Sequence, residues 1–345
     1  MRQQILRCPD ATLEPTAAPV LRSTVAAVWM RDALHRACRA VLPRVFVISS
    51  LLLAVAAAAL AEDGVPYEQR KDVVYGEVHG TGLLMDIFTP KRKPNGLAIV
   101  DVVSGAWYSD RNKIRDHTIA QLYTIYCARG YVVFAARPGS KTRYTAADMD
   151  QHVKTAIRYA KEHAAEFKID PSRLGLTGAS AGGHLATLAA LTPAQGKTDA
   201  RNPLDRHDTT VRAVGVFFPP TDFLEWENGK MADLSVVGPL LFGNGAQGRS
   251  QEEIKEAARG VSPLHRVGQP TIPFLLIHGD ADKVVPLTQS QKLVAAIKGS
   301  GGSAELIIKE GGGHPWPSLP EEVRIMADWF DRQLAGPPSP AALSK

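Results

Sequence analysis

Residues 174–186 read Leu174-Gly-Leu-Thr-Gly-Ala-Ser-Ala-Gly-Gly-His-Leu-Ala186 and are the most informative segment of this chain. It places an apolar, strand-like segment before Ser180 and a helix-like segment after it. Gly178 and Gly182 flank the serine, at positions where a Cβ would collide with the adjoining strand and helix. A G-x-S-x-G pattern between a strand and a helix is typical of a nucleophile elbow, a sharp turn that exposes the serine hydroxyl. The alternative is a glycine- and serine-rich turn without a catalytic role.

The segments around this turn alternate between buried-strand and helix patterns, which predicts a mostly parallel sheet with helices on both faces. We expect strands at 72–78, 83–88, 97–103, 131–136, 174–177, 211–218, 272–278 and 304–309, and helices at 113–129, 146–167, 181–191, 287–298 and 321–334. Ligands bind such sheets at the carboxyl ends of the strands, where Ser180 lies. Residues 224–262 break the alternation and predict a small cap insertion that is helical only at 251–259.

Residues 1–61 read as a leader. Positions 45–61 form an uncharged, predominantly apolar run that follows four arginines and ends in the small-x-small sequence Ala59-Leu60-Ala61. This pattern predicts a secretory signal peptide that starts at Met30, with residues 1–29 as a mis-assigned extension. We therefore expect a secreted or periplasmic protein that meets the membrane only transiently, and an uncleaved membrane anchor is the alternative. The mature domain then covers 62–335, and the Pro/Ser-rich tail 336–345 is expected to be disordered.

Charge and cysteine content exclude two classes of protein. The formal net charge of the chain is +5, but residues 1–61 alone hold seven arginines against three acidic residues. The remainder is nearly balanced, with a net charge of about +1, so no basic surface for nucleic acid is indicated. Cys127 is the single cysteine after the leader, so the exported domain is not a disulfide scaffold, and we expect Cys127 in the core.

Two later loops supply a candidate base and a candidate acid. His314 lies in the sequence GGGHP after the last predicted strand, and Asp282 lies in HGDAD after the strand before it. A serine hydroxyl is a weak nucleophile that needs a base within hydrogen-bond reach and a group that orients the base. Asp280 is the alternative acid, which we expect to bind backbone N–H groups of its own turn. His184 and His278 are expected to be packed residues without a direct catalytic role.

Acyl transfer also needs hydrogen-bond donors for the oxyanion of the tetrahedral intermediate. The N–H of Ala181, the residue after the candidate nucleophile, is one candidate. Gly105 and Ala106, in the sequence VSGAW at 103–107, are the others, because this loop follows a predicted strand. Trp107 is expected beside the acyl pocket, and core packing is an equally good interpretation of this residue.

The sequences GASAGGHLA, HGDADKVVP and GGGHPWP, in this order, resemble the esterase and lipase branch of the α/β-hydrolase superfamily. The likeness is closest to bacterial secreted carboxylesterases of the feruloyl-esterase and acetylxylan-esterase type, related to hormone-sensitive lipase, and covers roughly 72–334. The chain order of nucleophile, acid and base in that superfamily matches Ser180, Asp282 and His314. The resemblance implies an α/β-hydrolase fold and hydrolysis of a small-molecule or carbohydrate ester through an acyl-enzyme, without a metal or other cofactor. Oligomeric state is left open.

The oxyanion loop departs from these relatives. They usually carry His-Gly-Gly-Gly-Trp where this chain has VSGAW, so the histidine that braces the loop is missing and alanine replaces the third glycine. Two other functions stay open, the first because its catalytic domain has similar motifs and the second because the oxyanion loop is altered. One is a serine peptidase of the prolyl-oligopeptidase kind, and the other is a catalytically weak binding module of the cell envelope.

Overall fold

The computed structural model describes residues 64–268 and 272–335. The predicted leader and the C-terminal tail at 336–345 lie outside these residues. Within the described part of the chain, no helix is both long enough and apolar enough to cross a membrane.

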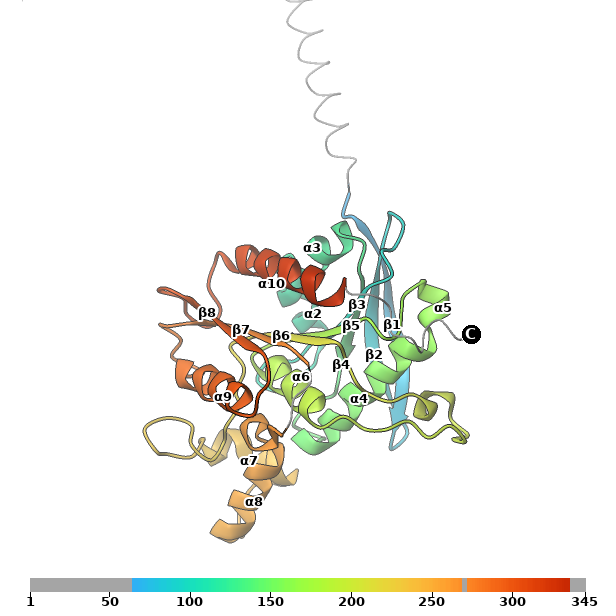
Figure 1. The fold of residues 1–345 in the computed structure, drawn as a ribbon. Helices are drawn as coiled ribbons and strands as arrows, with labels where there is room; N and C mark the ends of the chain where they lie inside the picture. Colours follow the sequence, from blue (N-terminus) through green and yellow to red (C-terminus); the bar gives the residue numbers. More distant parts are fainter. Residues whose placement is uncertain (1–63, 269–271, 336–345) are drawn as a thin grey trace, which may run out of the picture. The chain divides into compact units, whose positions relative to one another are not determined.

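An eight-stranded sheet forms the centre of the described domain, in the order β1-β2-β4-β3-β5-β6-β7-β8 (Figure 1). β1 pairs with β2 and β2 with β4 in antiparallel fashion, and every other neighbouring pair is parallel. This arrangement confirms the predicted α/β-hydrolase fold. The strands are β1 (Tyr67–Val78), β2 (Thr81–Pro90), β3 (Ala98–Val102), β4 (Val132–Arg137), β5 (Leu174–Ala179), β6 (Ala213–Phe217), β7 (Phe274–Gly279) and β8 (Ala304–Lys309).

Helices cover both faces of this sheet, as Figure 1 shows, with α2, α3 and α10 on one face and α4, α6 and α9 on the other. The α-helices are α2 (Arg111–Ile119), α3 (Leu122–Ala128), α4 (Ala146–Glu162), α5 (Ala164–Phe167), α6 (Ala181–Leu191), α7 (Leu234–Phe242), α8 (Gln251–Val261), α9 (Leu287–Gly299) and α10 (Leu319–Leu334), and two short 3₁₀ helices are η1 (Pro203–Arg206) and η2 (Pro263–Arg266).

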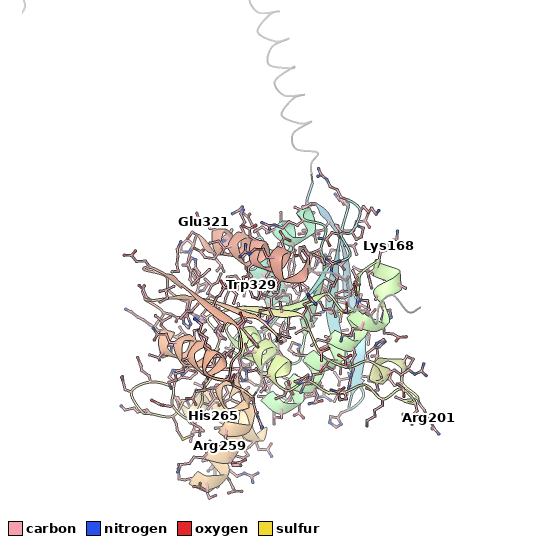
Figure 2. All side chains as sticks on the ribbon, in the orientation of Figure 1. Lys168, Arg201, Arg259, His265, Glu321 and Trp329 are labelled. Carbon is pink, nitrogen blue, oxygen red and sulfur yellow. The ribbon has the colours of Figure 1, made fainter. Side chains whose placement is uncertain are left out.

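The sheet divides the hydrophobic core in two, because successive side chains of a strand point to opposite faces. In β3, Val100 packs into the core beneath α4 and α6, whereas Ile99 packs into the core beneath α3 and α10. Trp329 of α10, labelled in Figure 2, is almost fully buried in the second core. Cys127 is buried in the same core with a free thiol, which confirms the position predicted for it.

The structure corrects the predicted helices in three places. The helix expected at 146–167 is interrupted at His163, which ends α4 and precedes α5. The helix expected at 113–129 is two helices, because Gln121 adopts a left-handed conformation with φ of 58° between α2 and α3. The segment between β6 and β7 contains α8, as predicted, and also α7, which was not predicted. Asp233 caps α7 by accepting a hydrogen bond from the Ser235 N–H, and a proline inside the helix hid the helical pattern.

Candidate active site

Ser180 occupies the sharp turn between β5 and α6. Its backbone has φ of 53° and ψ of −121°, a region that non-glycine residues rarely adopt, and its N–H is held by the Phe217 carbonyl at 2.9 Å. A Cβ on Gly182 would overlap the carbonyl oxygen of Val102, so the first turn of α6 can approach β3 only as glycine. The predicted elbow is therefore present, and the strain is concentrated at the residue whose hydroxyl it exposes.

A continuous chain of hydrogen bonds joins Ser180, His314 and Asp282. His314 Nε2 lies 2.9 Å from Ser180 Oγ, and His314 Nδ1 lies 2.6 Å from Asp282 Oδ2. The other carboxylate oxygen of Asp282 accepts the N–H groups of Val284 and Val285, at 2.8 and 2.9 Å. The structure thus brings together three side chains that are 134 and 32 residues apart in sequence, in the geometry of a nucleophile, a base and an orienting acid.

The carboxylate of Asp282 is held in its charged form. Burial alone would raise its pKa, and this is the largest single influence, since the side chain has no exposed surface. Hydrogen bonds from His278, His314 and the Val285 N–H outweigh burial together and place the pKa well below its usual range. An ionised Asp282 fixes Nδ1 of His314 as the protonated nitrogen and leaves Nε2 free to accept the serine proton.

His278 is a packed residue, as predicted, but it also contributes to this site. Its Nδ1 lies 2.7 Å from Ser290 Oγ, and its Nε2 lies 2.9 Å from the Val285 carbonyl and 3.4 Å from Asp282 Oδ2. The His278 ring therefore contacts both ends of the loop segment from Asp282 to Val285. This role of His278 was not predicted, and the one sequence signal for it is the spacing of four residues between His278 and Asp282 in HGDAD.

Asp280, the alternative acid, binds the loop that carries His314 rather than His314 itself. Its Oδ1 accepts the N–H of Gly311 at 2.7 Å, so it joins the loop after β7 to the loop that carries His314. The expectation that it would bind N–H groups of its own turn was wrong, because the two parallel strands β7 and β8 place the glycine loop within reach. Asp280 therefore positions the base loop, and Asp282 is the aspartate that contacts the histidine.

The candidate oxyanion loop is a two-residue turn. Gly105 and Tyr108 exchange both backbone hydrogen bonds, each at 2.9 Å, and the intervening Ala106 and Trp107 have φ of 48° and 60°. Positive φ at both central positions is typical of a type I′ turn. The Gly105 N–H is engaged inside this turn, so the interpretation of Gly105 as an oxyanion donor was wrong.

Two of the three predicted donors keep a free N–H. In residues 64–268 and 272–335, neither the Ala106 N–H nor the Ala181 N–H has a backbone or side-chain acceptor. Ala106 lines the cavity beside Ser180, and Ala181 opens α6, where the positive end of the helix dipole favours negative charge. The Gly182 N–H binds the Ser104 carbonyl at 3.0 Å and so ties the loop to the elbow.

Trp107 braces this loop through a buried histidine. Its indole Nε1 donates to His184 Nδ1 at 3.0 Å, and His184 Nε2 donates to the Val261 carbonyl at 2.8 Å. His184 is therefore neutral with its proton on Nε2, and burial lowers its pKa to about 4, although the bond to Val261 opposes this shift. Trp107 lines the cavity and also packs against Phe223, so it lies beside the pocket and in the core at the same time. These two hydrogen bonds connect the candidate oxyanion loop, α6 and the end of α8.

A cavity of about 750 Å³ contains Ser180 and His314. Apolar side chains of the segment between β6 and β7, chiefly Trp226, Val236 and Val237, line one part of it. Polar side chains of α2 line another part. As far as the structure is described, it holds no group of three or more His, Cys, Asp or Glu side chains suited to bind a metal ion.

Comparison with known proteins places this geometry among esterases. Residues 85–297 match the family model described as BD-FAE. Esterase LipC of Mycobacterium tuberculosis is 29% identical over 258 residues, which are 73% of this chain and 61% of that protein. The chain spans between about half and three fifths of the length of the mycobacterial relatives that it matches.

Two solved structures share the fold. A truncated carbohydrate esterase from gut microbiota is 28% identical, with a TM-score of 0.68, and the match covers 79% of this chain and 98% of that one. An esterase of Thermogutta terrifontis with bound propionate is 25% identical, with a TM-score of 0.58, and the match covers 78% of this chain and 94% of that one.

Proposed function

The chain belongs to the BD-FAE family, and we propose on that premise that it hydrolyses carboxylic esters with Ser180 as nucleophile. One observation carries the proposal: His314 bridges Ser180 Oγ and the buried carboxylate of Asp282 with contacts of 2.9 and 2.6 Å. The esterases to which the chain is similar support the same reaction.

Acylation starts at the Ser180 hydroxyl. His314 Nε2 accepts the hydroxyl proton as Oγ attacks the ester carbonyl, and Asp282 stabilises the imidazolium that forms. The tetrahedral oxyanion lies towards the N–H groups of Ala106 and Ala181, each worth about 3–4 kcal/mol to such a transition state. Collapse of the intermediate breaks the ester C–O bond, and His314 returns the proton to the leaving alkoxide.

Deacylation repeats these steps with water. His314 removes a proton from a water molecule as the water oxygen attacks the acyl-enzyme carbonyl. The N–H groups of Ala106 and Ala181 then bind the second oxyanion. Proton return to Ser180 Oγ releases the carboxylic acid and restores the starting state. The cycle needs no group outside the chain other than water and the ester.

For the substrate, we propose short-chain acyl esters or esters linked to a carbohydrate. The carbohydrate esterase and the propionate-bound esterase to which the chain is similar support this choice. A cavity of about 750 Å³ is large enough for a small acyl group together with a sugar-sized alcohol.

The test is hydrolysis of p-nitrophenyl acetate by the Ser180→Ala variant. We expect turnover to disappear, and we expect Ser300→Ala, a serine at the end of α9 outside the cavity, to retain wild-type turnover. Undiminished hydrolysis by folded Ser180→Ala protein would contradict the mechanism. A panel of fluorogenic dipeptides, run beside acetyl and butyryl esters, separates an esterase from a peptidase.

We also propose that the protein is exported, on the basis of the leader sequence alone. Expression of the full chain with a C-terminal tag in a bacterial host should yield a periplasmic or secreted product whose N-terminal residue is Glu62. Recovery of the intact leader in the membrane fraction would favour the anchored alternative instead.

A further inference from the structure

A second group of polar side chains faces the cavity from α2. Lys113, Asp116 and His117 all line it, because spacings of three and four residues place them on one face of the helix. None of the three belongs to the hydrogen-bonded chain of Ser180, His314 and Asp282. These three side chains therefore take no part in the proposed steps of ester hydrolysis.

A hydrogen bond to a buried aspartate orients His117, as one orients His314. Its Nδ1 lies 2.7 Å from Asp101 Oδ2, and the Tyr123 hydroxyl donates to the same oxygen at 3.1 Å. Asp101 and Tyr123 are fully buried, and Tyr123 is stacked on Phe88 with ring centroids 3.8 Å apart. A buried carboxylate on a central strand thus dictates the orientation of a histidine at the cavity wall.

One ring nitrogen of His117 remains available. Nδ1 is committed to Asp101, whereas Nε2 makes no hydrogen bond to any residue of the described chain. Burial is the largest influence on the pKa of His117 and acts to lower it, but the charge and hydrogen bond of Asp101 prevail and raise the pKa overall. Nε2 is a donor when the ring is charged and an acceptor when it is neutral.

The charges on this wall indicate the kind of ligand. Lys113 is paired with Asp116 at 3.0 Å, and Asp110 also lines the cavity, so the positive groups have no excess over the negative ones. An anionic ligand gains little from such a wall. A hydroxyl both donates and accepts, and it can therefore bind Nε2 in either protonation state and bind both members of the Lys113–Asp116 pair.

We propose that the α2 face of the cavity is a sugar-binding subsite, in which His117 Nε2 hydrogen-bonds a hydroxyl of the carbohydrate part of the ester. The inference rests on the proposed function, since it assigns the carbohydrate to one wall of the same cavity. The wall formed by Trp226, Val236 and Val237 is chiefly apolar, and its one charged neighbour at the cavity, Asp233, already accepts the Ser235 N–H as the cap of α7. This wall therefore suits the remaining part of the substrate.

The experiment replaces His117 by asparagine. The side-chain amide of His117→Asn can still donate to Asp101, but it lacks an atom at the position of Nε2. Arg115→Gln is the matched control, because Arg115 is on the same helix, is exposed and does not line the cavity. Binding of acetylated xylotriose is measured calorimetrically in the Ser180→Ala background, and hydrolysis of p-nitrophenyl acetate is measured with Ser180 intact.

We expect His117→Asn to weaken binding of acetylated xylotriose about tenfold or more, as for loss of a hydrogen bond to a charged or strongly polar group. Hydrolysis of p-nitrophenyl acetate, whose alcohol carries no sugar hydroxyl, should stay within about twofold, and Arg115→Gln should change neither. Unchanged sugar binding, absence of sugar binding to the Ser180→Ala protein, or an equal loss on both probes would overturn the subsite. Failure of the wild type to hydrolyse p-nitrophenyl acetate would count against the proposed function alone, because the binding measurement does not depend on turnover.

Discussion

Acid should destabilise this protein through His184, because the native state keeps that histidine neutral. The side chain has no exposed surface, its Nδ1 accepts the Trp107 indole N–H and its pKa is lowered to about 4 by burial. A histidine in the unfolded chain has a pKa of about 6.5. Between these two pH values His184 is protonated in the unfolded chain but not in the native protein. The free energy of unfolding therefore falls as the pH falls from about 6.5 to about 4.

The magnitude follows from the two pKa values. The full difference corresponds to about 3 kcal/mol once the pH is below both values. Between pH 7 and pH 4.5, about 2 kcal/mol of the free energy of unfolding should be lost through this one residue. Protonation of Nδ1 would also remove the acceptor of the Trp107 indole, so the brace of the oxyanion loop is expected to loosen together with the fold.

The comparison uses His184→Gln. Its side-chain oxygen can accept the Trp107 N–H and its amide can donate to the Val261 carbonyl, but the side chain does not titrate. Urea unfolding gives the free energy of unfolding of each protein at pH 7 and at pH 4.5. The decrease between the two pH values should be about 2 kcal/mol larger in the wild type than in the variant. All other titrating groups are shared and cancel. An equal loss in the two proteins would show that His184 does not cause the acid sensitivity.

Three further predictions concern the acid, the oxyanion loop and the thiol. Asp282→Asn should lower kcat for p-nitrophenyl acetate about 10³- to 10⁴-fold, whereas Asp280→Asn, which alters only the bond to the base loop, should stay within about tenfold; comparable losses would contradict the assignment. Ala106→Gly should raise Tm by about 2–4 °C in differential scanning fluorimetry, because alanine at φ of 48° costs about 1 kcal/mol, and a lowered Tm would count against this strain. Cys127, buried and with its pKa raised to about 12 by that burial, should react with Ellman's reagent only after denaturation, and rapid labelling of the native protein at pH 8 would show that the thiol is accessible.

Much of the site could be predicted because its signals are local. The elbow around Ser180 depends on steric demands within a few residues, which two glycines and a strand-to-helix change make visible in the sequence. The base loop is visible for the same reason, as His314 follows a strand and three glycines. The helices at 113–129 were less visible, since the left-handed residue Gln121 carries no sequence signal for a break.

Two kinds of hydrogen bond could not be predicted, one set by the conformation of a turn and one formed between distant elements. The Gly105 N–H is consumed by the Tyr108 carbonyl, which depends on the conformation of a turn rather than on its composition. The bond from Trp107 to His184 spans 77 residues, and it forms only because the loop after β3 packs over the helix that follows β5.

The alternation of strands and helices, the sharp turn at Ser180 and the chain order of Ser180, Asp282 and His314 can be read from the residues alone, because periodicity and glycine sterics act over short distances. Three features emerge from the folded domain: which aspartate contacts His314, which loop N–H groups remain free, and the contact of Asp101 with His117 at the cavity wall. Strand order and register set which side chains meet, and both result from packing of the whole sheet rather than from any single segment.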